Sequence, residues 1–336
     1  MQQTAPVGPE RIFQTLSAHQ ESAALNSAIE LEVFTRIAEG NSTAKEIAAA
    51  CGASERGIRI LCDSMTILGF LNKTDNTYSL NDLSSQFLDK SSPSYVGGTA
   101  IFLQSDKLLE GFRGLTDAVR NGGTSMKEGS LDPESPMWVK FARGMMGMMY
   151  PISQIIADSL GFETDRNLKV LDIAAGHGIF GISIAQKYPN AEIYALDWAN
   201  VLQVAAENAE RFGVATRHHL IEGSAFDVDY GTDYDVILLT NFLHHFDKPT
   251  CEILLKKIHG ALKEGGKVVT LEFIPNDDRI SPPMEAMFSL MMLAGTPQGD
   301  AYTFREIDEM LKNSGFSSSE HFPIEGMPNH LVFSIK

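Results

Sequence analysis

The residues best suited to chemistry begin at a glycine-rich turn, Asp172-Ile-Ala-Ala-Gly-His-Gly, which follows a short apolar segment. Residues 169–174 have the length and the branched side chains of a buried parallel strand. An amphipathic helical pattern starts directly after Gly178. Glycine lets the backbone come close to a ligand, and a helix N-terminus directs its N–H groups at that ligand. The turn therefore predicts a ligand-binding junction between a strand and a helix.

The acidic residue beside this turn separates two classes of cofactor. Gly176-x-Gly178-x-x-Gly181 satisfies the dinucleotide fingerprint, which is a weak signal by itself. Asp172 precedes these glycines at the strand end where open α/β sheets bind ligands. A pyrophosphate would face this carboxylate in a partly dry site, at a cost of several kcal/mol. A sulfonium and an ammonium would be attracted, so the pattern predicts S-adenosyl-L-methionine (SAM) rather than NAD. The alternative is that Asp172 only caps the helix or a loop.

Two further stretches are placed to contact the adenosine part of such a cofactor. Asp197 ends the next predicted strand, where a carboxylate can accept both ribose hydroxyls of SAM or of NAD. Trp198 follows it and either covers the adenine or packs between helix and sheet. After a third strand, Ser224 supplies a hydroxyl and Phe226 an apolar face to the adenine. These residues indicate a cofactor that contains adenosine, but they do not distinguish SAM from NAD.

The elements that must position these groups alternate between strand and helix from residue 168 onward, which predicts a doubly wound α/β sheet. The last two strands, near 316–324 and 330–335, are separated by a loop containing proline and glycine. We expect these two strands to be antiparallel. A dinucleotide-binding domain more often ends on a parallel strand, so this feature also favours SAM.

The N-terminal part predicts a winged helix, with a helical stretch over 10–40, two short helices and a small hairpin. Thr43 and Glu46 form a candidate capping box at the start of the second helix. Winged helices often bind DNA, but residues 43–90 carry five basic and six acidic side chains. That balance is not the basic footprint of a phosphate-binding surface, and it favours a packing or dimerisation module.

The composition limits the partners and the compartment that this protein can have. A chain of 336 residues can form two domains, and the net charge of −16 argues against nucleic acid and anionic membrane as partners. The three cysteines are sparse and the N-terminus lacks a secretory pattern. No apolar run approaches the length of a membrane span. We therefore expect a cytoplasmic protein, and no cluster of ligand residues predicts a metal.

Two methionine-rich segments are candidates for the wall of an acceptor pocket. One lies in a long helix predicted near 137–160, after Pro133 and Pro136, and includes Met145 and Met149. The other spans residues 284–293 and includes Met287 and Met291. Methionine is flexible and fills irregular space, and most of the cluster in the long helix is expected to be ordinary core.

Over nearly its whole length the chain resembles the SAM-dependent small-molecule O-methyltransferases with an N-terminal winged-helix dimerisation domain. The resemblance is carried by the Asp172 turn, Asp197, Gly223-x-x-Phe226, residues 235–246 and Gly265-Gly266-Lys267. It implies a Rossmann-like class I methyltransferase domain, with a seven-stranded, mostly parallel sheet and an antiparallel last strand. It implies a dimerisation domain at 1–95, a helical connector lining the substrate pocket at 96–160 and a SAM-binding domain at 161–336. A homodimer through the N-terminal domain follows from the same resemblance.

The resemblance also assigns roles to individual residues. His244 falls on the family's catalytic histidine, with His245-Phe246 replacing the Asp-Trp pair of the plant members. It would be the general base for the acceptor hydroxyl, because imidazole titrates near neutrality. Glu272 matches a carboxylate that orients this histidine. The resemblance and the patterns above together give the expected cofactor residues Asp172, Gly176, Gly178, Asp197, Trp198, Ser224, Ala225, Phe226 and Asn241. The methionine-rich segments give the expected substrate residues Met145, Met149, Met287 and Met291.

Three positions depart from the plant pattern. Ser224 replaces an aspartate, Thr240 replaces a lysine that touches SAM, and a second family carboxylate falls on or near Ala301. The alternative to a general base is therefore that His244 has a structural or substrate-shaping role. The predicted function is methyl transfer from SAM to a hydroxyl of a small, aromatic or conjugated molecule. The alternatives are a C- or N-methyltransferase of the same fold and a non-catalytic regulator that binds SAM or a metabolite.

Overall fold

The computed structural model describes residues 8–124 and 136–336, which form parts of two compact units, Met1–Gln104 and Ser105–Lys336. The division after Gln104 falls inside the expected connector at 96–160. Pro133, expected just before the long helix, lies outside the described residues. Within those two ranges, no helix combines the length and the apolar character needed to cross a bilayer.

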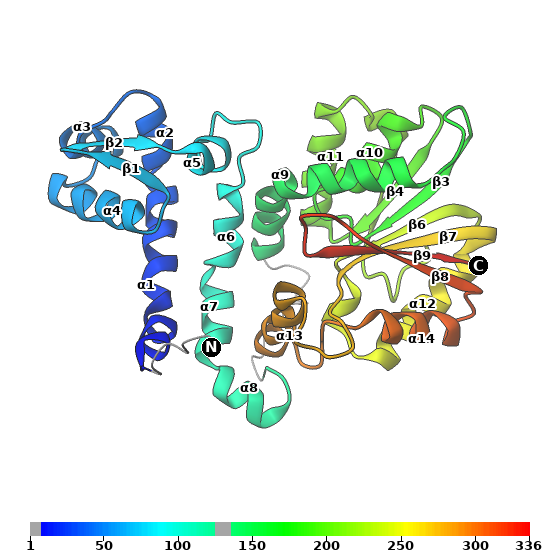
Figure 1. Cartoon of the computed structure of the whole chain (residues 1–336). Coiled ribbons are helices and arrows are strands. Elements are labelled where there is room, and N and C mark those ends of the chain that lie inside the picture. The colour runs from blue at the N-terminus through cyan, green and yellow to red at the C-terminus, as the bar shows by residue number, and fades with distance from the viewer. Residues whose placement is uncertain (1–7, 125–135) are drawn as a thin grey trace, which may run out of the picture. The chain divides into compact units, whose positions relative to one another are not determined.

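The N-terminal unit has the predicted winged-helix order of helices followed by a hairpin (Figure 1). Its elements are α1 (Glu10–Glu30), α2 (Val33–Ala38), α3 (Ala44–Cys51), α4 (Glu55–Ile67), β1 (Leu71–Thr74), β2 (Thr77–Leu80), α5 (Asp82–Phe87), η1 (Gly97–Thr99) and α6 (Ala100–Leu103). The expected capping box is confirmed, because Thr43 accepts from the Glu46 N–H and Glu46 accepts from the Thr43 N–H. The single helix expected over 10–40 is wrong: Glu32 has φ 57° and separates α1 from α2.

The C-terminal unit is built on one seven-stranded sheet with the order β5-β4-β3-β6-β7-β9-β8. Its strands are β3 (Lys169–Ile173), β4 (Glu192–Asp197), β5 (His218–Glu222), β6 (Tyr234–Thr240), β7 (Leu262–Phe273), β8 (Ser318–Pro323) and β9 (Asn329–Ile335). Strands β3 to β7 pair in parallel, while β9 is antiparallel to both of its neighbours. The predicted mixed sheet and its antiparallel last strand are confirmed.

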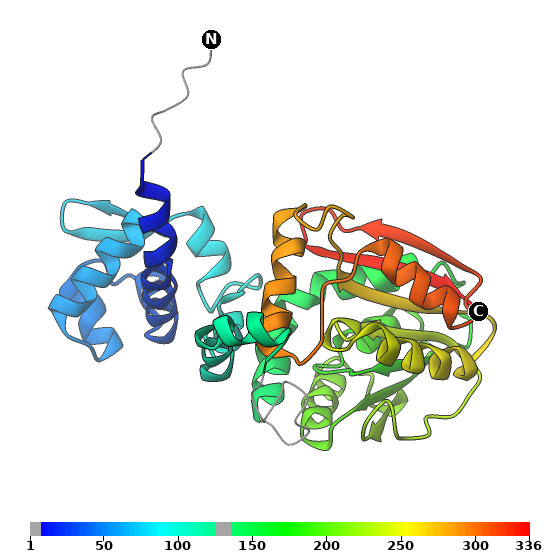
Figure 2. The same cartoon turned by 90° about the horizontal axis from the view of Figure 1, so that it is seen from below.

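Helices cover both faces of this sheet, as Figures 1 and 2 show. The helices of the C-terminal unit are α7 (Asp106–Arg113), α8 (Leu115–Asn121), α9 (Pro136–Ser159), α10 (Ile179–Lys187), α11 (Ala199–Arg211), α12 (Lys248–Ala261), α13 (Pro283–Gly295) and α14 (Phe304–Asn313), with short turns η2 (Ala215–Arg217) and η3 (Leu243–His245). Of these, α7 and α8 contact α13. One core lies between the sheet and α9 and α10, and a second lies between the sheet and α12 and α14. Every residue of β6 is buried, which explains its continuous apolar run.

Close packing of α10 on the sheet depends on the third glycine of the turn. A Cβ at Gly181 would lie 2.6 Å from Cγ2 of Ile193 on β4 and 3.2 Å from a carboxylate oxygen of Asp172 on β3. Both neighbours are buried, so neither can move away cheaply. Gly181 is therefore a packing requirement, and it holds the N-terminus of α10 against the ends of two strands.

We expect Gly181→Ala to lower the free energy of unfolding by about 1–3 kcal/mol, because the added methyl overpacks the core. Gly260→Ala is a matched control, since Gly260 also lies in a helix but a Cβ there would meet nothing within 4 Å. The control should leave stability unchanged or raise it slightly. Urea unfolding followed by circular dichroism measures both variants. Equal stabilities for the two would contradict the packing role.

Candidate active site

The glycine turn between β3 and α10 is a left-handed bend with open space above it. Ala174, Gly176 and Gly178 have φ values of 54°, 58° and 72°. A Cβ at Gly178 would lie 2.9 Å from Cβ of Ala205 on α11, so the turn is pressed against that helix. A Cβ at Gly176 would meet only the Ala174 carbonyl oxygen, at 3.8 Å. The backbone at Gly176 can therefore be approached closely by a ligand.

Asp172 lies beneath this turn and is completely buried. Its Oδ2 accepts the N–H of Gly181 at 3.1 Å, in the first turn of α10, and its Oδ1 has no hydrogen-bond partner in the described part of the chain. Desolvation raises the pKa of this carboxyl to about 8; the Gly181 hydrogen bond opposes that shift, and the charge of Asp197 adds to it. The alternative that Asp172 caps the helix is thus realised through Oδ2. The unpartnered Oδ1 is the atom that could stabilise a positive charge.

Asp197 ties the end of β4 to the same turn. Its Oδ2 accepts the N–H of Gly176 at 2.8 Å, and its Oδ1 accepts the N–H of Trp198 at 2.7 Å. Desolvation raises the pKa of Asp197 to about 6, although both backbone hydrogen bonds lower it. Each carboxylate oxygen keeps a free lone pair, because one hydrogen bond does not saturate it.

The loop after β5 and the segment after β6 complete this edge of the sheet. Ser224 Oγ accepts the N–H of Phe226 at 3.2 Å, while Ala225 is buried beneath them. Asn241 has φ 52°, and its side-chain oxygen accepts from Asn329 on β9 at 3.1 Å. Because the carboxyl ends of parallel strands meet at one edge, these predicted cofactor residues lie at the same end of the sheet as Asp172 and Asp197.

His244 is held by Glu272 at the end of the neighbouring strand β7. Oε1 of Glu272 accepts the N–H groups of Phe242 and Leu243 at 2.9 and 2.8 Å, and Oε2 lies 2.5 Å from Nδ1 of His244. Both side chains are buried, with residue exposures of 5% for His244 and 3% for Glu272. A carboxylate that already accepts two backbone donors makes Nδ1 the donor, so Nε2 carries the free lone pair. Within residues 8–124 and 136–336, the hydrogen bond of the His244 ring is the one at Nδ1, and Nε2 makes none.

The adjacent histidine has a different environment. Burial, together with the nearby His244, holds the pKa of His245 well below its usual range. Its Nδ1 has no hydrogen-bond partner among the residues that the structure describes, and its ring lies edge-on to Trp138 with centroids 5.9 Å apart. His245 therefore stays neutral and belongs to an aromatic wall with Trp138, Phe242 and Phe246.

Comparison with known proteins identifies the family. The family model of the O-methyltransferase domain matches residues 112–317, and the model of the O-methyltransferase dimerisation domain matches residues 13–90. The chain belongs to the O-methyltransferase family. It is an enzyme of the SAM-dependent class, and SAM is its cofactor.

Three similar proteins illustrate this O-methyltransferase relationship. The tetracenomycin polyketide synthesis 8-O-methyl transferase TcmO of Streptomyces glaucescens is 28% identical, over 98% of this chain and 97% of that protein. A candidate O-methyltransferase of Nostoc punctiforme PCC 73102 has a crystal structure with 50% identity and a TM-score of 0.94, covering 99% of this chain and 100% of that one. Human N-acetylserotonin methyltransferase in complex with SAM shares the fold, with 21% identity, a TM-score of 0.85 and coverage of 100% and 99%.

The residues of this O-methyltransferase fit its cofactor. The space above Gly176 admits a ligand at van der Waals distance from the backbone. The unpartnered, buried Oδ1 of Asp172 suits a cation, because a positive charge beside this carboxyl would lower its raised pKa and favour the ionised form. Trp198 is half-buried and packs with Val201 and Val204 of α11, so the helix-packing alternative is realised at least in part. Whether the ring of Trp198 also covers adenine stays a prediction.

The four predicted substrate methionines lie in different environments. Met149 is buried in the core with Ile152 and Ile156, and Met145 packs against the same cluster. On α13, Met287 is 61% exposed and Met291 is half-buried. The residue that reaches the catalytic candidate is Phe288, whose ring lies 4.8 Å from that of His244 and stacks on Phe273 at 3.9 Å.

Sequence reasoning included Phe288 only as one member of the segment 284–293, and its choice of methionines gave no sign of this contact. The clue available was helical spacing, because Glu285, Phe288 and Met292 share one face of α13 and are the less exposed positions. No group of three or more potential metal-ligating side chains gathers anywhere in the described ranges.

The buried Asp172 predicts a pH dependence of stability. Its folded-state pKa of about 8 lies above its ordinary value of 3.8, so the folded protein holds this proton more tightly than the unfolded chain does. The resulting stabilisation is complete below about pH 4 and is lost as the pH rises to about 8. We expect Asp172→Asn to gain stability relative to wild type across this window, because asparagine cannot ionise.

Urea unfolding at pH 5 and pH 8.5 measures this difference. Asp165→Asn, at an exposed position, is the control and should follow the wild-type pH dependence. Parallel pH profiles for Asp172→Asn and wild type would show that the Asp172 carboxyl is not perturbed in the folded state.

Proposed function

We propose that this O-methyltransferase moves the methyl group of SAM to a hydroxyl of a small aromatic molecule, with His244 as general base. One observation carries the proposal: Glu272 fixes Nδ1 of a buried histidine and leaves Nε2 unpartnered. The second nitrogen is thereby the proton-accepting one. An imidazole with this orientation, placed at the carboxyl edge of a cofactor-binding sheet, is suited to general base catalysis.

The cofactor would be held by residues already placed at the turn and the neighbouring loops. Asp197 would accept the ribose hydroxyls with its remaining lone pairs, and Phe226 would offer a face to the adenine. Asp172 would stabilise the positive end through its orphaned oxygen. When bound, SAM supplies an electrophilic methyl group on a good leaving group.

His244 and Glu272 then act on the acceptor. Nε2 of His244 takes the hydroxyl proton as the oxygen attacks, and Glu272 stabilises the imidazolium that forms. Glu272 also holds the backbone of Phe242 and Leu243, so the base cannot rotate away from the acceptor. Alignment of hydroxyl and methyl in a site that excludes water supplies much of the remaining rate enhancement.

His245 would shape the pocket without taking the proton. Its pKa is held well below neutrality, so it has little affinity for the hydroxyl proton. Its neutral ring lies edge-on to Trp138 and Phe242 and would shape the pocket through these aromatic contacts. The two neighbouring histidines would thus have distinct roles, set by Glu272 on one side and by an apolar wall on the other.

The aromatic surroundings of His244 support an aromatic acceptor. Phe288 presents its edge to the His244 ring and stacks on Phe273 with an interplanar angle of 12°. Trp138 and Phe242 flank His245. Flat, apolar surfaces of this kind bind rings by stacking and edge contacts. TcmO is named for polyketide synthesis and the human relative for N-acetylserotonin, which agrees with this class of acceptor.

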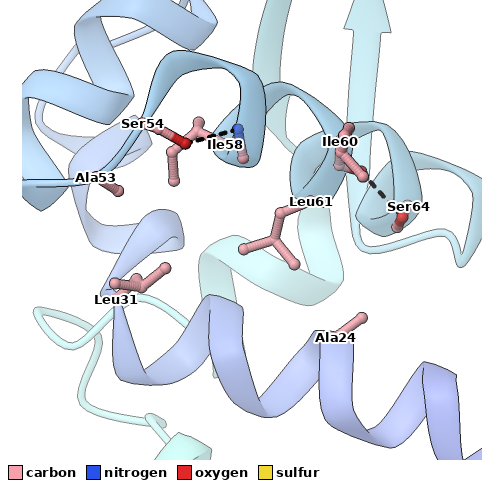
Figure 3. Close-up of a pocket in the computed structure, with 9 residues that line it drawn as sticks. Ala24, Leu31, Ala53, Ser54, Ile58, Ile60, Leu61 and Ser64 are labelled. Atoms are coloured by element: carbon pink, nitrogen blue, oxygen red, sulfur yellow. Dashed lines mark hydrogen bonds between the residues drawn. The ribbon is translucent and has the colours of Figure 1, made fainter.

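We also propose a homodimer formed by the N-terminal unit, and the match to a dimerisation domain supports it. A groove of about 360 Å³ between α1 and α4 is lined by apolar side chains, Leu31, Ile58 and Leu61 among them (Figure 3). Farther along α1, Ile12, Phe13 and Leu16 are more than 60% exposed. Apolar surface of this extent favours burial against a partner.

We further propose a cytoplasmic location, with which the free cysteines Cys51, Cys62 and Cys251 agree.

Cofactor binding tests the first part of the proposal. Isothermal titration should show binding of SAM and no binding of NAD. We expect Asp197→Ala to weaken SAM binding about 10-fold or more, because hydrogen bonds to a charged group are lost. Asp233→Ala, an acidic residue in the exposed turn before β6, is the control and should bind like wild type. Heat with NAD and none with SAM would reject the cofactor assignment.

Turnover tests the role of His244. Incubation with SAM and a panel of hydroxynaphthoates and N-acetylserotonin should yield a methylated product by mass spectrometry. For the acceptor that reacts, His244→Asn should lower kcat by about 10²–10⁴-fold, because the general base is lost. Its affinity for S-adenosylhomocysteine should stay unchanged, which shows an intact fold. Near-normal turnover of His244→Asn would remove this residue as the base.

A further inference from the structure

The loop that follows β5 is folded tightly on itself. The Ser224 carbonyl accepts the N–H groups of Asp227 and Val228, each at 3.0 Å. Gly223 has φ 131°, and a Cβ there would lie 2.4 Å from Cγ1 of Val228. The loop is therefore a compact turn with a fixed path. Its carbonyl groups at 225, 226 and 228 are not used within this turn and need donors from elsewhere.

A single lysine on α12 supplies those donors. Nζ of Lys257 lies 3.0 Å from the Ala225 oxygen, 3.0 Å from the Phe226 oxygen and 2.7 Å from the Val228 oxygen. An ammonium has three N–H groups, so every donor of Lys257 is used on this loop. The ammonium also lies over the ring of Tyr230, 4.6 Å from its centroid. Burial lowers the pKa of Lys257, and the charges of Asp227 and Asp229 oppose that effect.

The loop in turn contacts the catalytic segment. The Phe226 ring packs edge-on against Phe246 at 5.0 Å and lies 6.5 Å from Phe242. Phe242 donates its N–H to Glu272, the carboxylate that orients His244. A displacement of Phe226 would therefore change both the surface expected to face the adenine and the packing of the turn after β6.

We propose that Lys257 is a positioning residue for cofactor binding, which fixes residues 224–228 in the conformation that faces the adenine. The inference rests on the proposed function, because it takes these residues as the adenine-binding loop. Lys257 itself does not touch the cofactor: all of its donors end on loop carbonyls. Without it, three partly buried carbonyls would lose their partners and the loop would sample other conformations, so binding would have to order it.

Two ligands measured by isothermal titration test the proposal, S-adenosylhomocysteine and 5′-methylthioadenosine. Lys257→Met keeps the unbranched stem over Tyr230 and removes all three donors. We expect both ligands to bind about 10- to 100-fold more weakly, by the same factor, because the effect acts on the adenosine end. Lys256→Met is the matched control: this neighbour is exposed and its only ion pair in the described chain is with Glu252 at 3.8 Å. It should bind both ligands within twofold of wild type.

A second variant keeps the test decisive if Lys257→Met does not fold. Lys257→Arg retains the charge but cannot place three donors in the same way, and it should give an intermediate loss for both ligands. Circular dichroism at the titration temperature confirms that each variant is folded. Binding within twofold of wild type in the folded variants would overturn the proposal. A loss for S-adenosylhomocysteine alone would also overturn it, since the effect would then lie outside the adenosine end. Failure of wild type to bind either ligand would instead reject the cofactor site itself.

Discussion

The position of His244 in this O-methyltransferase depends on the hydrogen bonds of one buried carboxylate, Glu272. Glu272 is only 3% exposed, and a carboxylate at that depth is strongly destabilising unless donors surround it. Those donors are the backbone N–H groups of Phe242 and Leu243 and Nδ1 of His244. The chain after β6 must therefore turn sharply at Asn241, with φ 52°, to bring all three to one side chain. Orientation of the proposed base is a consequence of this requirement.

A second electrostatic feature lies on the cofactor side. Asp172 and Asp197 both have raised pKa values, chiefly because burial removes water from their charges. Two desolvated acids close together are unfavourable in the free protein, and a cationic ligand relieves that situation. The strain is tolerated because Gly176, Gly181 and Trp198 donate backbone N–H groups to these carboxylates. Gly176, which leaves space above the backbone, thus also donates to Asp197, while Gly181, which lies packed against the sheet, donates to Asp172.

Much of the fold could be predicted from periodicity and turn chemistry. The strand at β3, the glycine turn and the capping box at Thr43 each depend on residues within a few positions of one another, and the antiparallel pairing of β8 with β9 depends on the short loop between them. The break at Glu32 was missed because no glycine or proline marks it, and packing of α1 and α2 in one core overrides the helical pattern. The methionines chosen as substrate residues stay a prediction. The contact of Phe288 with His244 was not predicted, since composition alone does not tell which side of α13 faces His244.

The sequence by itself determined the kind of cofactor and the kind of sheet, because an acid next to glycines and an alternation of strands and helices are local patterns. Only the tertiary structure decided how these groups are used. Asp172 accepts a hydrogen bond from α10 at Gly181, nine positions later in the chain. Glu272 binds His244, 28 positions earlier, and Lys257 donates to the carbonyl groups of a loop that lies 29 to 32 positions before it. Such contacts form where strand ends meet at one edge of a sheet. Their partners are set by packing and by the need to satisfy buried polar groups, which no short stretch of sequence encodes.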